Sequence, residues 1–280
     1  MPRKTASTKK QQDISDTPRK TAKQWVEEGN TYYKEKRYDE ALAAYKEAIK
    51  RDAKMVSAHI GKGNALFELE RYQAALTAYE RAIQLKLNSA EAYNGKGKAL
   101  MMLDFNEEAL EACEQAIQLD PRNSNSYYNR GQVLWMLDRN DEALAAYEQA
   151  IQVDPTNATA YNGKALLLNE LERREEALAA YEQAIQLAPN EAKFISNKGV
   201  LLQSTKHYQE ALAVFEQAIQ VDPNYIYAWK GKVEVLFQLR RYEEAEKAQE
   251  RVEQLEEEGY GDDEDEFPDL ILIFSELPGR

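Results

Sequence analysis

The sequence predicts an all-α protein built from a repeated pair of helices. One alanine recurs seven times at every thirty-fourth position, at Ala41, Ala75, Ala109, Ala143, Ala177, Ala211 and Ala245. A second alanine keeps the same phase at Ala48, Ala82, Ala116, Ala150, Ala184 and Ala218. A glycine recurs with this period at Gly29, Gly63, Gly97, Gly131 and Gly199. A fixed period of this length indicates stacked repeats rather than one globular core.

Each repeat contains two apolar faces with helical spacing. Residues three or four positions apart share one face of a helix, so 25/29/32 forms one stripe and 41/45/48 a second one. Small residues allow the two backbones to approach, and a ring fills the space toward the next repeat. That ring position holds Tyr45, Tyr79, Tyr147, Tyr181 and Phe215, with Cys113 there once. Neither helix buries its stripe alone, so the repeats must stack.

The helix ends are also marked in the sequence. Thr21 and Gln24 form a capping-box pattern, which predicts that the first helix begins near Ala22. Prolines stop the later second helices, whereas Ala53 and Leu87 stand at these places in the first two repeats and predict less sharp breaks there. The second helix of the last repeat is highly charged, as expected of a cap with one face in water. The prolines are Pro121, Pro155, Pro189 and Pro223.

These positions resemble the tetratricopeptide repeat (TPR) family over residues 22–259. Trp25, Gly29, Tyr32, Ala41, Tyr45 and Ala48 fit the family pattern in the first repeat, and NGKGKALMMLDFNEEALEACEQAIQLDP fits it in the third. The resemblance implies a right-handed α–α superhelix, a TPR solenoid, whose first helices line a concave groove. The predicted division is a basic disordered arm at 1–21, seven helix pairs at 22–55, 56–89, 90–123, 124–157, 158–191, 192–225 and 226–259, and an acidic linker with an apolar segment at 260–280.

The resemblance implies that residues on the first helices contact a protein or peptide partner. Asparagine is frequent among them, and its amide can both donate to and accept from an extended backbone. A methionine and aromatic cluster, which includes Met102 and Met136, has the composition of a binding hot spot. Alternatively, the asparagines simply face solvent and the cluster belongs to the core. The candidate groove residues are Asn30, Asn64, Asn94, Lys98, Met101, Tyr128, Asn129, Gln132, Trp135, Asn162 and Asn197.

One sharper expectation from the family is not met by the residues. Chaperone-binding members hold a terminal carboxylate with basic and asparagine side chains on three consecutive first helices. Here Asn30 and Asn129 match that pattern, but Val26, Thr159 and Gly163 stand where it needs basic residues. We therefore expect no clamp of that kind.

The two ends of the chain have opposite charge. Residues 1–23 carry seven basic side chains against two acidic ones, and residues 253–280 carry eleven carboxylates against Arg280 alone. The body between them is acidic, which predicts no binding to nucleic acid. The apolar residues near the C-terminus favour aggregation if left in water, so we expect them to dock on their own array, on another copy or on a partner. These candidate docking residues are Phe267, Leu270, Ile271, Leu272, Ile273 and Phe274.

The remaining features bound the class of protein. No apolar run has the length of a membrane span or the character of a secretory signal, so a cytoplasmic location with no membrane contact is expected. One cysteine, two histidines and the absence of phosphate-loop, metal-spacing or nucleophile motifs predict no enzyme, metal or cofactor. The predicted function is a protein-interaction scaffold. The alternatives are a structural solenoid that self-associates through its tail and a non-catalytic adaptor subunit of a separate enzyme.

Overall fold

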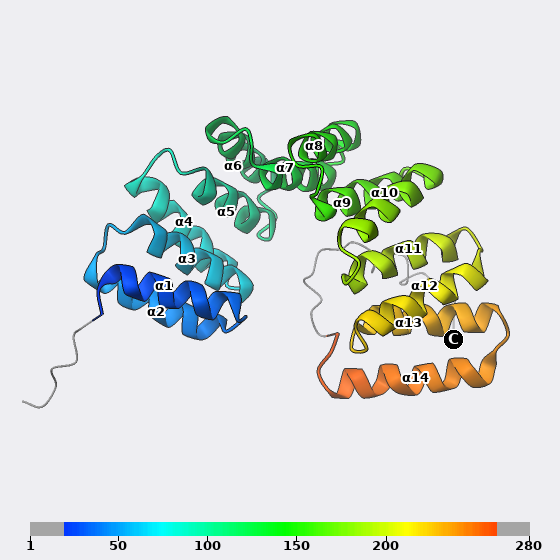
Figure 1. Cartoon of the computed structure of the whole chain (residues 1–280). Helices are drawn as coiled ribbons and strands as arrows, with labels where there is room; N and C mark the ends of the chain where they lie inside the picture. Colours follow the sequence, from blue (N-terminus) through cyan, green and yellow to red (C-terminus); the bar gives the residue numbers. More distant parts are fainter. Residues whose placement is uncertain (1–19, 262–280) are drawn as a thin grey trace, which may run out of the picture. The chain divides into compact units, whose positions relative to one another are not determined.

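The computed structural model describes residues 20–261, and this part of the chain forms fourteen α-helices and no strand. The two helices of each repeat pack against each other in antiparallel fashion (Figure 1). The all-α repeat fold predicted from the constant repeat period is confirmed. The helices are α1 Ala22–Lys34, α2 Tyr38–Arg51, α3 Val56–Glu68, α4 Tyr72–Leu85, α5 Ala90–Met101, α6 Asn106–Leu119, α7 Ser124–Met136, α8 Asn140–Val153, α9 Ala158–Glu170, α10 Arg174–Leu187, α11 Ala192–Ser204, α12 Tyr208–Val221, α13 Ile226–Gln238 and α14 Tyr242–Glu257.

The contacts between helices divide the described residues into two compact modules. The N-terminal module comprises residues 20–87 with α1 to α4, and the C-terminal module comprises residues 88–261 with α5 to α14. Within each module, a second helix contacts the first helix of the following repeat, for example α2 with α3 and α8 with α9. Each repeat thus depends on its neighbour for burial of its apolar faces.

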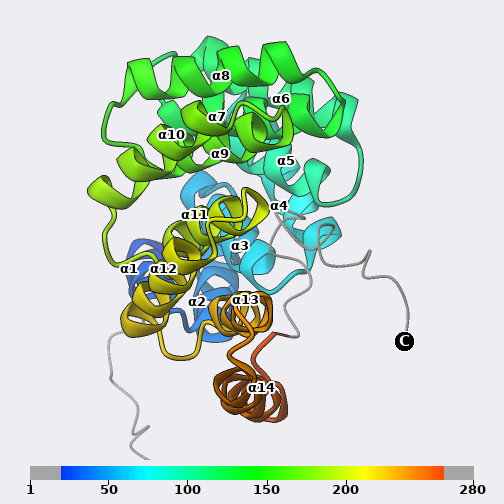
Figure 2. The same cartoon turned by 90° about the vertical axis from the view of Figure 1, so that its right-hand side faces the viewer.

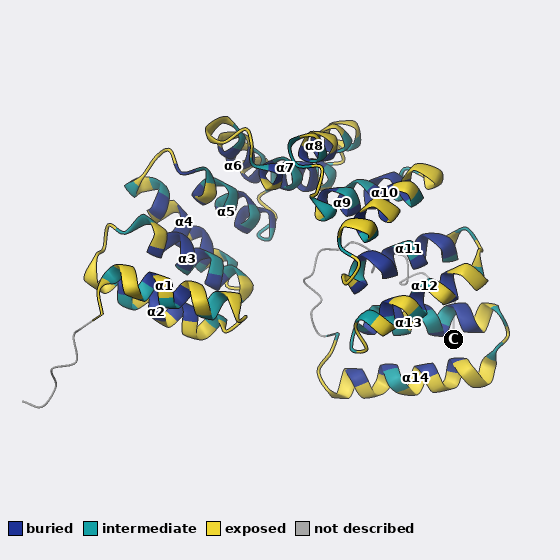
Figure 3. Cartoon of the chain, viewed as in Figure 1, coloured by how far each residue is buried: buried dark blue, intermediate teal, exposed yellow. Residues whose placement is uncertain are grey.

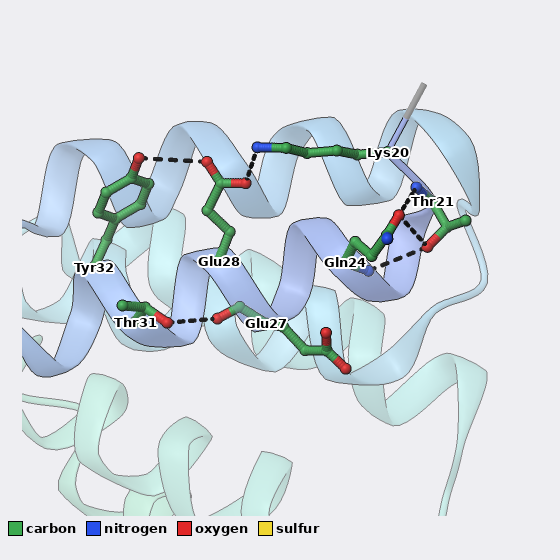
Figure 4. A network of polar contacts seen from close by, with 7 residues as sticks. All are labelled: Lys20, Thr21, Gln24, Glu27, Glu28, Thr31 and Tyr32. Atoms are coloured by element: carbon green, nitrogen blue, oxygen red, sulfur yellow. Dashed lines mark hydrogen bonds and ion pairs between the residues drawn. The ribbon is translucent and has the colours of Figure 1, made fainter. Parts of the chain in front are cut away.

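The start of α1 follows the predicted capping box. Thr21 accepts a hydrogen bond from the Gln24 backbone N–H at 3.2 Å, and the Gln24 side chain accepts one from the Thr21 backbone N–H at 2.8 Å (Figure 4). Two of the otherwise unpaired N–H groups at the helix start are satisfied in this way. Glu28 on the same helix pairs with Lys20, which ties the chain before α1 to the helix surface.

The second helices end at equivalent positions whether or not a proline follows. α2 ends at Arg51 just as α8 ends at Val153, although only the latter is followed by a proline. The expectation of less sharp breaks after the first two repeats is therefore wrong. Asp52 explains the first of them, because its carboxylate accepts from the Lys54 backbone N–H at 2.9 Å and turns the chain out of the helix.

All seven first helices end in the same tight turn. A residue just beyond each first helix adopts a left-handed conformation with φ between 56° and 64°, although none of the seven is glycine. In the first repeat, the backbone N–H groups of Lys36 and Arg37 donate back to the carbonyls of Tyr33 and Tyr32 at 3.0 and 2.9 Å. This pair of bonds satisfies the last carbonyls of the helix. The seven residues are Lys36, Glu70, Asp104, Asp138, Glu172, Lys206 and Arg240.

The core of the stack is an aromatic ring held between two first helices. Phe215 on α12 is fully buried, and its ring faces Gly199 on α11 of its own repeat and Gly231 on α13 of the next. A Cβ added at Gly231 would lie 2.4 Å from the ring and one at Gly199 would lie 2.7 Å from it. Tyr45 occupies the same place between Gly29 and Gly61 in the N-terminal module. The predicted role of the ring between repeats is confirmed.

Ion pairs join each second helix to the following first helix over the later joins of the C-terminal module. Lys164 pairs with Glu148 at 2.8 Å, and Lys198 pairs with Glu182 at 2.9 Å, each across a step of 16 residues. Lys232 and Glu216 repeat the contact at 2.9 Å. The carboxylates are half exposed, so each pair contributes a few tenths of a kcal/mol. At the α2–α3 join, two lysines, Lys46 and Lys62, occupy the equivalent positions.

The last helix differs from the others in its exposure. α14 lies beside α13 and is seen nearly end on in Figure 2. It buries Ala245, Ala248, Val252 and Leu255 against the preceding repeat, whereas its other side is exposed along its length (Figure 3). This polar outer face confirms the expected cap. α8 and α10, which share the sequence EALAAYEQAIQ, bury alanines at equivalent positions: Ala143, Ala146 and Ala150 in α8, and Ala177, Ala180 and Ala184 in α10.

Replacement of Gly231 by alanine tests the close approach of α13 to the ring. Helix propensity alone favours Gly231→Ala by up to about 1 kcal/mol. We expect the reverse, a loss of about 1–3 kcal/mol, because the new methyl group overlaps the buried Phe215 ring. Chemical denaturation measures the change, and Phe215→Leu in the same chain should recover part of the loss. A more stable Gly231→Ala protein would contradict the proposed packing.

The like-charged α2–α3 join predicts a stabilising substitution. Lys46→Glu places a carboxylate opposite Lys62 and restores the ion pair found at the later joins. We expect a gain of about 0.5 kcal/mol at low salt that shrinks as salt is added. Thermal unfolding at two salt concentrations measures it. Lys46→Gln serves as the control, since it removes the repulsion without adding a partner, and equal effects of both changes would argue against the pair.

Candidate functional site

The first helices lie on the inner side of the C-terminal module. α5 contacts α7, α7 contacts α9, α9 contacts α11 and α11 contacts α13. The second helices of this module contact first helices but not each other. A stack whose first helices touch while its second helices are separated must curve toward the first helices. The candidate site residues of this module therefore lie on its concave side or in the seams beneath it. A seam is the contact between two neighbouring first helices.

The structure places the two predicted asparagines of the N-terminal module above buried tyrosines. The hydroxyl of Tyr45 donates to the Asn30 carbonyl oxygen at 2.7 Å, and that of Tyr79 donates to the Asn64 oxygen at 2.8 Å. Each asparagine therefore uses its acceptor internally, which leaves the two N–H groups of its amide for other contacts. Asn30 is exposed and Asn64 is half-buried.

Four of the predicted asparagines form pairs between neighbouring first helices. The Asn129 amide donates to the Asn94 oxygen at 2.8 Å, linking α7 to α5. The Asn197 amide donates to the Asn162 oxygen at 3.0 Å, linking α11 to α9. Asn129, Asn162 and Asn197 are all buried. They therefore lie in the seams, where each pair satisfies one N–H donor and one oxygen acceptor that would be costly to bury unpaired.

The methionine and aromatic cluster is divided between core and surface. Met101 is buried with 1% exposure, whereas Met136 is 38% exposed. Trp135 is half-buried and packs on the apolar clusters to either side of it, and its ring N–H donates to the Glu170 carboxylate at 2.6 Å. Tyr128 lies in the seam, where its ring centroid is 5.8 Å from that of Tyr147.

Two further candidates lie near this cluster. Gln132 is buried, and Lys98 is half-buried. The predicted docking residues Phe267, Leu270, Ile271, Leu272, Ile273 and Phe274 lie outside the residues that the structure describes. Burial thus separates the predicted set into seam residues and a smaller exposed group.

Two acidic residues at the ends of first helices accept hydrogen bonds from aromatic side chains, which the sequence patterns above did not predict. Glu170 accepts from Trp135, and Glu68 accepts from the Tyr33 hydroxyl at 2.8 Å. Burial raises the pKa of Tyr33, and the Glu68 carboxylate adds to the shift. Both contacts span 35 residues, as do the two asparagine pairs. An aromatic donor followed 35 residues later by a glutamate is the sequence signal of these two contacts.

The described residues contain no cluster of histidine, cysteine or acidic side chains that fits a metal ion. Cys113 is completely buried at the ring position of its repeat, as expected from the sequence. Burial raises the pKa of its thiol to about 12. The thiol is therefore protonated at neutral pH. Because the thiolate is the reactive form, the native thiol is unreactive there.

Tandem antiparallel helix pairs with small residues at their seams define a helical-repeat protein. Family models described as tetratricopeptide repeat match residues 26–88 and 128–192, residues 87–156, and residues 202–257. The chain belongs to the tetratricopeptide repeat family. Proteins of this family bind other proteins or peptides and are typically non-catalytic, so the chain is a protein-interaction scaffold in this general sense.

Solved structures share this fold at low sequence identity. The APC/C hetero-tetramer Cut9–Hcn1 matches with a TM-score of 0.70 and 18% identity over 79% of this chain, which spans 44% of that one. A repeat protein from Parabacteroides merdae gives 0.65 and 15% identity, covering 86% of this chain and 94% of its own. TTC0263 of Thermus thermophilus gives 0.61 and 22%, covering 65% and 100%. These likenesses show the fold alone.

No curated protein matches the sequence closely enough to count as a relative. Among residues 20–261, none of the helices combines the length and the apolar character needed to cross a membrane.

The burial of Cys113 predicts that its thiol reports unfolding. We expect negligible reaction with a thiol reagent at neutral pH in the native protein and complete reaction in denaturant, because the native thiol is protonated and out of reach of solvent. With a reagent that releases a chromophore when it reacts with a thiol, absorbance measures the rate of labelling. Rapid labelling under native conditions would contradict the packing of Cys113 against Gly97.

Proposed function

We propose that the concave side of the C-terminal module binds a segment of a partner protein, with Trp135 and Met136 at the centre of the contact. This proposal rests on the exposure of Met136 beside Trp135 within the methionine and aromatic cluster. Trp135 has its ring supported by the core and its N–H fixed by Glu170, while Met136 is 38% exposed beside it in sequence. A fixed aromatic group next to an adaptable apolar side chain is the usual composition of a binding hot spot.

The repeat geometry supports an apolar floor for this contact. A step of 35 residues joins Trp135 to Glu170 and Asn94 to Asn129 on neighbouring first helices. The same step relates Met136 to Met101. Met101 is buried and Met136 is 38% exposed, so Met136 is the one of these two residues that we propose meets the partner.

The polar groups suggest the chemistry of the partner segment. Glu170 is exposed, and its carboxylate has further acceptor sites beyond the bond from Trp135. A segment with an apolar side chain followed by a cationic or N–H donor group fits this arrangement. Asn129, Asn162 and Asn197 hold the first helices at their spacing, and Asn94 is the amide of this module proposed for a contact with a peptide backbone. Asn30 and Asn64 are separate candidates for such contacts on the N-terminal module.

Selection of short peptides on the purified full chain tests the proposal. We expect peptides with an apolar anchor to be enriched and Met136→Ser to weaken their binding about ten-fold, as for other hot-spot truncations. Trp135→Phe keeps a packed ring but removes the donor to Glu170, so it should weaken binding less. Fluorescence anisotropy gives the affinities.

Leu187→Ser is the matched control. Leu187 is also 38% exposed but lies on α10, a second helix. Peptide binding that is unchanged in this variant and lost in Met136→Ser supports the site. Equal losses in both variants would show that exposed apolar area alone attracts the peptides.

Self-association through the C-terminal segment is the second candidate function. Its support is the exposed aromatic pair of Phe237 and Tyr242 on the last repeat, with 51% and 58% exposure. It predicts a particle size that grows with concentration and that deletion of residues 262–280 abolishes. Light scattering on both chains separates it from binding to a different protein.

A further inference from the structure

Within residues 20–261, the last repeat presents an aromatic pair that no further repeat covers. Phe237 at the end of α13 and Tyr242 at the start of α14 have ring centroids 6.1 Å apart. Tyr33 and Tyr38 form the equivalent pair in the first repeat, with centroids 5.5 Å apart. The first pair is half-buried, whereas more than half of each ring residue in the last pair is exposed.

In the N-terminal module, one residue of the following first helix lies on the aromatic pair. The Tyr33 hydroxyl donates to Glu68 at 2.8 Å, and the same carboxylate contributes, after burial, to the raised pKa of Tyr38. In the sequence, Leu272 has the same spacing from the last aromatic pair as Glu68 has from the first. It follows Phe237 and Tyr242 by the same two steps along the sequence by which Glu68 follows Tyr33 and Tyr38.

The apolar segment near the C-terminus keeps the register of the repeats. A leucine recurs with the period of the repeats at Leu66, Leu100, Leu134, Leu168, Leu202 and Leu236, and each of these six is buried. The next position in this series is Leu270. Leu272 occupies the place of Glu68, and an apolar side chain suits Phe237, which has no hydroxyl group to donate. The sequence of the segment thus complements the edge that it follows.

The chain leaves α14 next to the edge in question. Gly259 and Gly261 have φ of +85° and +102°, and the Tyr260 backbone N–H closes the helix by donating to the Leu255 carbonyl at 2.8 Å. The Tyr260 hydroxyl accepts from the Asn224 amide at 3.0 Å, just before α13 begins. The exit point therefore lies at the start of α13. The eleven residues from there to Leu272 reach up to about 36 Å when extended, and α13 is only about 20 Å long.

We propose that the residues Leu270–Ile273 dock on the exposed edge of the last repeat of their own chain, with Leu272 on the Phe237–Tyr242 pair and Phe274 beyond the contact. The segment takes the place of the end of a further first helix. It covers the apolar edge, which would otherwise be open to a second copy or another protein. This proposal does not depend on the site at Trp135, because it concerns the far end of the module.

Hydrogen exchange of the full chain tests the docking with a matched pair of variants. Deletion of residues 262–280 and Leu272→Asp should each speed amide exchange in α13 and α14 by about ten-fold or more, since the edge loses its cover. Phe274→Asp should leave exchange unchanged. Its equivalents in the other repeats are the left-handed turn residues, which are all charged and exposed. Exchange in α7 and α8 is the internal reference.

Three results would overturn the proposal. Equal effects of Leu272→Asp and Phe274→Asp would show a contact without the repeat register. Unchanged exchange after the deletion would show that the segment does not cover this edge. Protection that disappears on dilution, together with a dimer in light scattering, would assign the edge to a second copy.

Discussion

The stacking of the repeats depends on one contact, in which a ring from a second helix lies between the backbones of two first helices. Phe215 faces Gly199 and Gly231, and Tyr45 faces Gly29 and Gly61. The ring fixes the distance inside its own repeat and the distance to the next one at the same time. Tyr181 occupies this position where Ala165 and Asn197 replace the glycines, and Asn197 there bonds to Asn162. The contact therefore accommodates some variation when other groups restore the seam.

The polar groups on the first helices have two separate roles. The pairs Asn94–Asn129 and Asn162–Asn197 fix neighbouring helices to each other, and their bonds satisfy amide groups that would be costly to leave unpaired. The contact from Trp135 to Glu170 lies nearer the surface and presents both an apolar ring and a carboxylate to solvent. A binding surface built on such seams is positioned by the core, so a partner meets groups that are already oriented.

Much of the fold could be predicted because the constant repeat period determines helix pairing and burial together. The start of α1 after Thr21 followed from the capping-box pattern, and the burial of Cys113 followed from its position in the repeat. The left-handed turns escaped prediction because Lys36, Glu70 and the others are not glycine. The period also continues through Leu87 and Asn88, so it does not indicate the division into two modules. Which asparagines are buried depends on how far one helix rotates against the next, and spacing along one chain does not contain that angle.

The shared sequence of α8 and α10 has a consequence for how such a chain changes over time. EALAAYEQAIQ occurs in both helices, whereas the first helices α7 and α9 differ almost throughout. The second helices can therefore keep the contacts that assembly needs while the first helices differ on the surface that they present. Unequal recombination between these identical stretches would add or remove a complete repeat with its seams intact. A new surface would then arise by exchange of a whole repeat, with no alteration of the core.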